Sequence, residues 1–228
     1  MEGWEVSSKR FVAFFDIMGF KDMVVRHDNS DIYKTLSELH ESVLNPINEI
    51  QRDLEHFDTI DIQTVMFSDS IMLVSNKDTK RAAMSILYYS GYLLSFCLKE
   101  KIPVKGAISY GTMTSDFEKS IHFGQPLIDA YLLEEDLKLY GCVIDNNFEM
   151  YLRDNEMLEG LEKYKTPLKS GKVSHYNIDW TMFNNRHKVV KNITDIFDNL
   201  YSSVSGATRI YVDNTLDFYE EMKKKQNN

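Results

Sequence analysis

The chain has 228 residues, a formal net charge of −9 and 43% hydrophobic residues. This composition is ordinary for a soluble globular protein, and the acidic balance argues against a nucleic-acid-binding protein, which would carry a basic surface. No N-terminal segment has the layout of a signal peptide, and no apolar run approaches the ~20 residues of a membrane-spanning helix. We therefore expect a cytoplasmic protein that binds neither nucleic acid nor membrane. Cys97 and Cys142 form no CxxC pair, which argues against a zinc site or a disulfide framework.

After a polar lead-in over residues 1–9, the segment Arg10–Phe20 reads RFVAFFDIMGF. Its short aromatic and β-branched run is typical of a buried strand. The run ends on Asp16, and Gly19 follows soon after. A carboxylate at the end of a buried strand is costly to desolvate unless it has a partner. Asp16 therefore either caps the next turn or holds a cation.

The segment Gln63–Ser75, QTVMFSDSIMLVS, repeats this pattern. Asp69 stands at the tight point between two apolar half-strands, which predicts a hairpin turn. If the hairpin pairs with the first strand, Asp16 and Asp69 share one rim of one sheet. Two convergent carboxylates are the usual protein contribution to a Mg²⁺ site, in which waters and substrate phosphates fill the remaining positions.

The rest of the chain alternates helices and strands. Apolar residues at helical spacing predict a helix over 21–54, with a kink or end at Asn45-Pro46. The same spacing predicts a helix that begins at residue 127 and further helices over 79–100, 148–161, 181–203 and 214–225. Strands are predicted over 102–113 with a turn at Gly111, and over 141–144 and 173–180. The segment 163–172 is basic and turn-like. This order predicts an α+β sandwich, with one mixed sheet and helices packed against it.

Four segments in this order resemble the motifs of the class III nucleotidyl cyclase homology domain. They are FFDIMGF with Asp16, FSDSI with Asp69, VKGAISYG with Lys105, and GQPLIDAYLLE at the start of a helix. Ser68 stands where the family usually has glycine, and Lys105 stands where it has arginine. The resemblance implies a ferredoxin-like sandwich with a mostly antiparallel sheet. It implies a catalytic domain over 10–180 and a C-terminal helical extension over 181–228 packed on the same domain.

The departures from the family pattern concern the groups that read the purine and stabilise the transition state. Ile128 and Leu132 replace the asparagine and arginine that stabilise the transition state in adenylyl and guanylyl cyclases. Val65 replaces the lysine that selects adenine, and Ile121 replaces the acidic partner of the purine. The two metal-binding carboxylates, in contrast, are retained.

This combination resembles the small pyrimidine cyclases of bacterial Pycsar antiphage systems. The resemblance implies conversion of UTP to cUMP, or of CTP to cCMP, as a signal that activates a separate effector. We lean to UTP, because uridylate cyclases are the commoner members. The family also implies a head-to-tail homodimer whose sites take groups from both chains.

The resemblance assigns the metal and phosphate roles residue by residue. Asp16 and Asp69 would hold two divalent ions, Mg²⁺ or Mn²⁺, with the backbone carbonyl of Ile17 as a further ligand. Met18, Gly19 and Phe20 would bring backbone N–H groups toward the triphosphate. The reaction itself is intramolecular phosphoryl transfer, in which positioning and charge compensation carry the catalysis.

The remaining assignments leave alternatives open. Lys105 and Lys169 would bind the triphosphate, or each is an ordinary exposed lysine. Val65 and Ile121 would line the base pocket, or they are part of the core. Nothing in the sequence selects a replacement for the missing asparagine and arginine, for which three further residues are candidates: Arg10, Tyr110 and Tyr131.

Other classes of protein fit less well. An aspartyl phosphatase needs a second aspartate two positions after the first, where this chain has Met18. A diguanylate cyclase would carry GGDEF or GGEEF, which is absent from the sequence. The non-enzyme alternative is a degenerate cyclase domain that binds a nucleotide without turnover.

Overall fold

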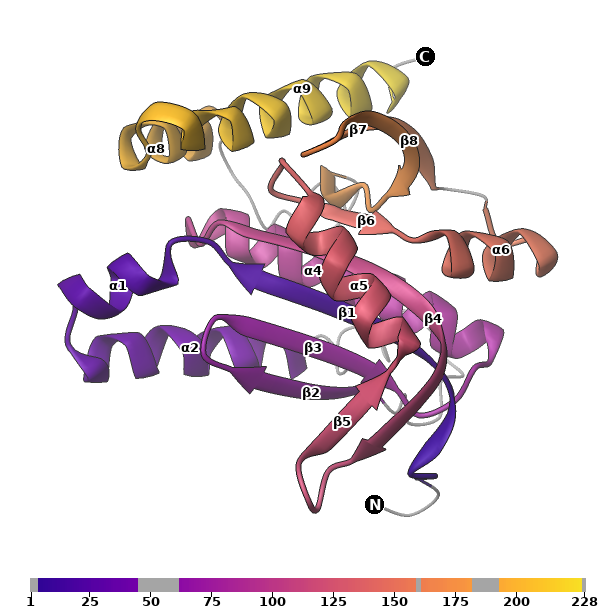
Figure 1. Cartoon of the computed structure of the whole chain (residues 1–228). Coiled ribbons are helices and arrows are strands. Elements are labelled where there is room, and N and C mark those ends of the chain that lie inside the picture. Colours follow the sequence, from indigo (N-terminus) through magenta and orange to yellow (C-terminus); the bar gives the residue numbers. More distant parts are fainter. Residues whose placement is uncertain (1–3, 45–61, 159–160, 182–192, 227–228) are drawn as a thin grey trace.

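The computed structural model of the chain describes residues 4–44, 62–158, 161–181 and 193–226. Within these ranges the strands form one mixed sheet in the order β2-β3-β1-β4-β6-β8-β7, and β5 pairs with β4 (Figure 1). β4 and β6 run parallel, and the other described neighbours run antiparallel. The strands are β1 (Ser7–Ile17), β2 (Ile62–Phe67), β3 (Ser70–Ser75), β4 (Val104–Asp116), β5 (Ile121–Gly124), β6 (Cys142–Ile144), β7 (Glu162–Leu168) and β8 (Gly171–Asn177).

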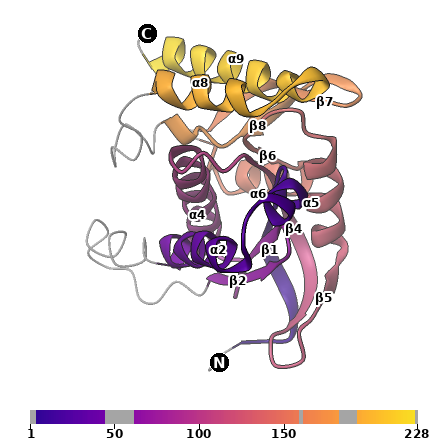
Figure 2. The same cartoon turned by 90° about the vertical axis from the view of Figure 1, so that its left-hand side faces the viewer.

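The described helices are α1 (Phe20–Arg26), α2 (Asn29–Leu44), α4 (Lys80–Lys99), α5 (Gln125–Asp136), α6 (Asn146–Asp154), α8 (Ile193–Ser203) and α9 (Arg209–Gln226), with a short 3₁₀ turn η1 (Gly206–Thr208). They lie on both faces of the sheet. Figure 2 shows α2 and α4 on one side of the sheet, and α5 on the other. The predicted α+β class, with one mostly antiparallel sheet and packed helices, is therefore confirmed.

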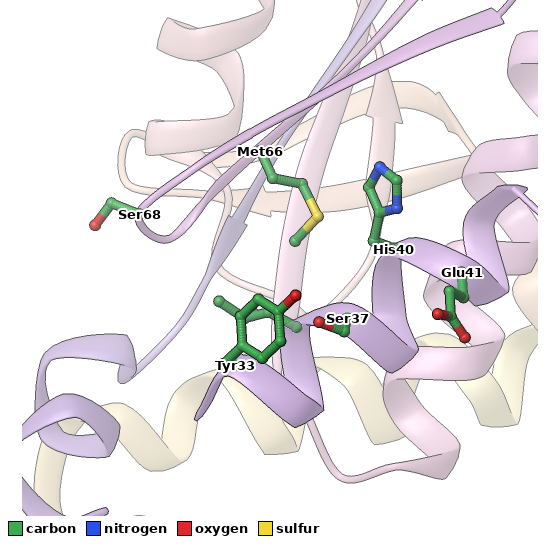
Figure 3. Close-up of a pocket in the computed structure, with 7 residues that line it drawn as sticks. Tyr33, Ser37, His40, Glu41, Met66 and Ser68 are labelled. Atoms are coloured by element: carbon green, nitrogen blue, oxygen red, sulfur yellow. The ribbon is translucent and has the colours of Figure 1, made fainter. Parts of the chain in front are cut away.

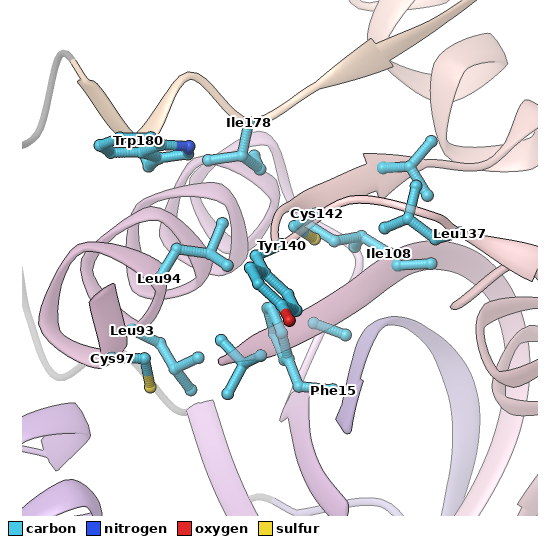
Figure 4. Close-up of a cluster of buried hydrophobic side chains, with 14 of the residues drawn as sticks. Phe15, Leu93, Leu94, Cys97, Ile108, Leu137, Tyr140, Cys142, Ile178 and Trp180 are labelled. Atoms are coloured by element: carbon cyan, nitrogen blue, oxygen red, sulfur yellow. The ribbon is translucent and has the colours of Figure 1, made fainter. Parts of the chain in front are cut away.

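β1 is the central strand, between β3 and β4. Because side chains alternate along a strand, Phe11 and Phe15 enter the main core with α4, whereas Val12, Phe14 and Asp16 lie on the opposite face, called here the Asp16 face. The main core contains Phe15, Leu93, Leu94 and Tyr140 (Figure 4). β4 approaches Phe15 closely, since a Cβ atom on Gly106 would lie 2.2 Å from the Phe15 ring.

The Asp16 face is covered in part by α5. Tyr131 packs edge-to-face on Phe14, with ring centroids 5.6 Å apart. Leu127 packs against the small cluster of Val12, Met72, Val74 and Met113. α5 thus lies along β1 and β4, and it brings its C-terminal end toward the end of β1.

Two expectations for strands and turns are wrong. β4 runs without interruption through Gly111, which lies opposite Arg10 of β1. The glycine does not form a turn, and a Cβ atom there would make an ordinary van der Waals contact with Pro126 at 3.4 Å. The segment 163–172 contains strand β7 and not merely a turn. Its burial alternates from exposed Lys163 and Lys165 to buried Tyr164 and Thr166, and an edge strand tolerates Pro167.

In its described part, residues 21–44, the helix predicted over 21–54 is divided into α1 and α2, because the chain leaves helical geometry at His27. The predicted kink at Asn45-Pro46 lies outside the described residues, as does most of the first half of the helix predicted over 181–203. The helix over 79–100 is confirmed as α4, whose N-cap Thr79 accepts a hydrogen bond from the N–H of Ala82 at 3.1 Å.

The C-terminal helix α9 packs against β7 and the chain that precedes β6. Phe218 makes an edge contact with Tyr164, with ring centroids 5.0 Å apart. The Asn214 side chain donates a hydrogen bond to the carbonyl of Lys138 at 2.6 Å. Across the described ranges, we find no helix with both the length and the apolar character that a membrane span requires.

Candidate functional site

Asp16 and Asp69 lie together at one end of the sheet. Asp16 is paired with Ser70 of β3, the residue that follows Asp69 in the hairpin. The N–H of Ile17 donates to the carbonyl of Asp69 at 2.8 Å. Burial raises the pKa of Asp16, the charge of Asp69 raises it further, and the charge of Lys105 opposes the change. The two carboxylates are therefore close enough to repel each other.

The hairpin turn that carries Asp69 is a two-residue loop between Phe67 and Ser70. Ser68, the first loop residue, has a φ of 56°, in the left-handed region that favours glycine. Serine adopts this conformation at a higher cost than glycine does. The turn holds Asp69 against the end of β1.

Gly19 connects β1 to α1 and has a φ of 77°. Phe20 is the first residue of α1, and the first N–H groups of a helix have no intrahelical acceptor. The N–H of Met18, in contrast, donates to the carbonyl of Pro103 at 2.8 Å. The chain thus places the N–H groups of Gly19 and Phe20 just beyond Asp16, and the side chains of α1 are not buried.

Lys105 is buried beside Asp16, its cross-strand neighbour on β4. Its ammonium group lies 2.8 Å from Oε1 of Glu134 on α5, and it donates to the Glu134 carbonyl at 2.8 Å. The Lys105 and Glu134 side chains are only 7% and 4% exposed. Burial raises the pKa of Glu134, and the hydrogen bond and charge of Lys105 oppose the change. Lys105 is therefore not an ordinary exposed lysine.

Lys169 lies in the turn between β7 and β8. Its N–H donates to the carbonyl of Asp136 at 2.8 Å, and its Nζ lies 3.2 Å from Oε1 of Glu135. The two side chains of this pair are about half exposed, at 48% and 52%. Both predicted triphosphate lysines therefore meet the C-terminal end of α5, Lys105 in a buried pair and Lys169 in an exposed one.

The predicted base-pocket residues lie on two different strands. Val65 of β2 is opposite Met72 and is partly buried against the cluster on the Asp16 face. Ile121 begins β5 opposite Asp116 and is 47% exposed. Val65 therefore contributes to packing, whereas Ile121 is free to contact another molecule.

Of the three candidates for the missing transition-state groups, two are engaged elsewhere. Arg10 is fully buried, and it donates to the carbonyls of Ser75 and Asn76, each at 3.0 Å. It is also six residues from Asp16 along β1, a separation of about 20 Å. The Tyr110 hydroxyl donates to Asp78 at 3.1 Å, and its ring stacks on Phe11 in the opposite face of the sheet.

A separate cavity of about 340 Å³ lies between α2 and the β2–β3 hairpin. Figure 3 shows Tyr33, Ser37 and His40 of α2 on one side of it, with Met66 and Ser68 on the other. Met66 is paired with Ile71, which belongs to the main core. The cavity therefore opens on the helix side of the hairpin and not on the Asp16 face.

The donor set at the end of β1 suits a hard divalent cation. Asp16 and Asp69 supply carboxylate oxygens, which Mg²⁺ and Mn²⁺ prefer, and Mg²⁺ sites commonly use one or two carboxylates with waters and phosphates. In the described part of the chain, no group of three or more His, Cys, Asp or Glu side chains could hold a metal ion. Asp16 and Asp69 are thus a set of two carboxylates, a number that fits the protein share of a Mg²⁺ site.

No protein-family model and no curated protein matches the chain, but solved structures do. One is the catalytic core of a rhodopsin-guanylyl cyclase with converted specificity in complex with ATPαS, with a TM-score of 0.55, 16% identity, and coverage of 78% of this chain and 98% of that one. An adenylate/guanylate cyclase/hydrolase from Silicibacter pomeroyi has a TM-score of 0.47 and 13% identity over 75% of this chain and 95% of its own. The first likeness shows that the chain has the fold of a nucleotidyl cyclase catalytic core.

Proposed function

We propose that the chain is a nucleotidyl cyclase. The ribose 3′-hydroxyl attacks the α-phosphate of a nucleoside triphosphate, the bond to the leaving pyrophosphate breaks, and a 3′,5′-cyclic nucleotide forms. The observation that carries the proposal is the meeting of Asp16 and Asp69 at one end of the sheet, in a fold shared with a cyclase catalytic core. The raised pKa of Asp16 is consistent with a carboxylate pair that a cation would stabilise.

Asp16, Asp69 and the carbonyl of Ile17 would hold two Mg²⁺ or Mn²⁺ ions. When bound, such ions supply Lewis-acid chemistry that lowers the pKa of the 3′-hydroxyl and compensates phosphate charge. The N–H groups of Gly19 and Phe20 orient the triphosphate. Lys169 would bind the triphosphate from the β7–β8 turn. Its ion pair with Glu135 is exposed, so Lys169 can leave Glu135 for a phosphate at little cost.

The substrate we favour is UTP, with cUMP as the product, and CTP is the second candidate. The apolar residues Val65 and Ile121 offer no charged group to read a purine edge. We further propose that the cyclic nucleotide activates a separate effector in antiphage defence. These finer assignments rest on the resemblance of the four motifs to the Pycsar pyrimidine cyclases.

We propose that the protein acts as a homodimer. The support comes from large apolar side chains that are exposed on β5 and on α5, which follows it directly: Ile121 at 47%, Phe123 at 59%, Ile128 at 51% and Leu132 at 54%. Clustered exposed apolar residues commonly mark a protein interface. In such a dimer Ile128 and Leu132 supply contact area instead of polar groups.

The test is incubation of purified protein with Mn²⁺ and each of four labelled nucleoside triphosphates. The proposal expects cUMP from UTP, and no product from Asp16→Ala or Asp69→Ala. Conversion of ATP alone would show that the base assignment is wrong. Tight nucleotide binding without turnover would favour the degenerate, non-catalytic alternative.

A further inference from the structure

On the Asp16 face, the register of the strands arranges the side chains in rows. The row at the end of β1 contains Asp16 with its neighbours Ser70 and Lys105. The next row contains Phe14, with Met72 of β3 and Ala107 of β4 beside it. The two rows are separated by two residues of strand, about 6.6 Å. Val65 lies opposite Met72 and extends the second row.

α5 follows the same rows. Its Glu134 pairs with Lys105 in the first row, and its Tyr131 packs on Phe14 in the second row. Residues three apart on a helix lie on one side of it. Tyr131 is therefore placed one row from the carboxylate pair, on the face that carries Asp16.

Tyr131 differs from the other candidates in being unengaged. Its side chain is 46% exposed, and its hydroxyl forms no hydrogen bond with the described residues. Arg10, in contrast, donates a hydrogen bond to the carbonyl of Ser75, and the Tyr110 hydroxyl donates one to Asp78. Tyr110 also lies on the opposite face of the sheet. Among these three, Tyr131 alone presents a polar group to a ligand on the Asp16 face.

We infer that Tyr131 contacts the nucleoside half of the bound nucleotide, with its hydroxyl hydrogen-bonded there. The inference rests on the proposed function, which places the phosphates at Asp16 and Asp69. The nucleoside then extends away from the carboxylates toward the next row, where the half-exposed ring of Tyr131 covers Phe14. A half-exposed aromatic ring with one hydroxyl suits an uncharged ring system that needs one oriented polar contact.

The test compares Tyr131→Phe with Tyr110→Phe, which removes a hydroxyl from the opposite face. Loss of one neutral hydrogen bond to the substrate raises KM for UTP about three- to tenfold in Tyr131→Phe and leaves kcat within about twofold. The dissociation constant of a non-hydrolysable UTP analogue, measured by calorimetry, rises by the same factor. Tyr110→Phe keeps both values.

An unchanged KM and dissociation constant in Tyr131→Phe would overturn the inference. A fall in kcat with KM unchanged would also overturn it, because the hydroxyl would then act only in the transition state. The proposed function fails separately, if Asp69→Ala retains turnover. If Asp69→Ala loses turnover while Tyr131→Phe keeps the wild-type KM and dissociation constant, only the role of Tyr131 is rejected.

Discussion

Lys105 of β4 and Glu134 of α5 form an ion pair 2.8 Å long that is almost wholly removed from solvent. Lys105 is also the cross-strand neighbour of Asp16. The pair therefore fastens the C-terminal end of α5 to the sheet directly beside the candidate metal site. Such a pair is costly to break, because removal of one partner leaves a buried charge without compensation.

Glu134→Gln should lower the free energy of unfolding, by less than the about 3 kcal/mol of a fully uncompensated buried charge, because the Lys105 ammonium group would lose Glu134 but keep Asp16 beside it. Glu135→Gln is the matched control, because the next residue on α5 pairs with Lys169 in solvent. That change should cost less than about 1 kcal/mol. Urea unfolding of the two variants measures the difference, and equal losses would contradict the structural importance of the buried pair.

Asp16→Asn should stabilise the metal-free protein at neutral pH. The pKa of Asp16 is raised in the folded state, chiefly by burial and then by Asp69. The folded state therefore binds a proton more readily than the unfolded state, and its stability falls as pH rises through the folded pKa. The gain from Asp16→Asn should be largest at pH 7 and should shrink toward pH 4, near the ordinary pKa of aspartate of about 3.9.

Thermal unfolding in a chelator, at several pH values, measures this pH dependence. A gain of 1 kcal/mol would appear as a rise in Tm of about 2–4 °C. The electrostatic origin of the effect would be contradicted if the variant were less stable than wild type at pH 7. It would also be contradicted if the gain in stability were the same at every pH.

Ser68→Gly should stabilise the hairpin that carries Asp69. Ser68 has a φ of 56°, a conformation that costs a residue with a Cβ atom roughly 1 kcal/mol and costs glycine little. Ser174→Gly is the control, because Ser174 lies within strand β8 and glycine there should destabilise by about 0.5–1 kcal/mol. Thermal unfolding of both variants measures the two changes, which should have opposite signs.

Leu132→Glu should dissociate the proposed homodimer without unfolding the chain. Leu132 on α5 is 54% exposed, so a carboxylate is tolerated in the monomer but not in an apolar interface. Met150→Glu is the matched control, at 54% exposure on α6. Sedimentation velocity measures the mass, and identical behaviour of the two variants would place the interface elsewhere.

The sequence was informative where structure is set by short stretches of chain. Alternating apolar residues with a central aspartate predicted the hairpin of Asp69, and the apolar run before Asp16 predicted β1. Both depend on local spacing and turn chemistry, which a single sequence contains. The amphipathic helix after Thr79 was predicted for the same reason.

What could not be predicted depends on contacts between distant segments. The sequence gives no sign that Lys105 pairs with Glu134, because the pair exists only once α5 lies along β1 and β4. The strand β7 was missed because Pro167 and several lysines are typical of a turn, although an edge strand accepts both. The engagement of Arg10 with the carbonyls of Ser75 and Asn76 is equally non-local.

Binding of Mn²⁺, followed by electron paramagnetic resonance without nucleotide, tests most directly whether Asp16 and Asp69 act together on a cation. Wild-type protein should bind Mn²⁺, and Asp16→Asn and Asp69→Asn should each weaken binding about tenfold or more. Asp116→Asn, which removes a carboxylate paired with Lys119 in the β4–β5 turn, should bind as wild type does. Wild-type affinity in both Asp16→Asn and Asp69→Asn would contradict the account.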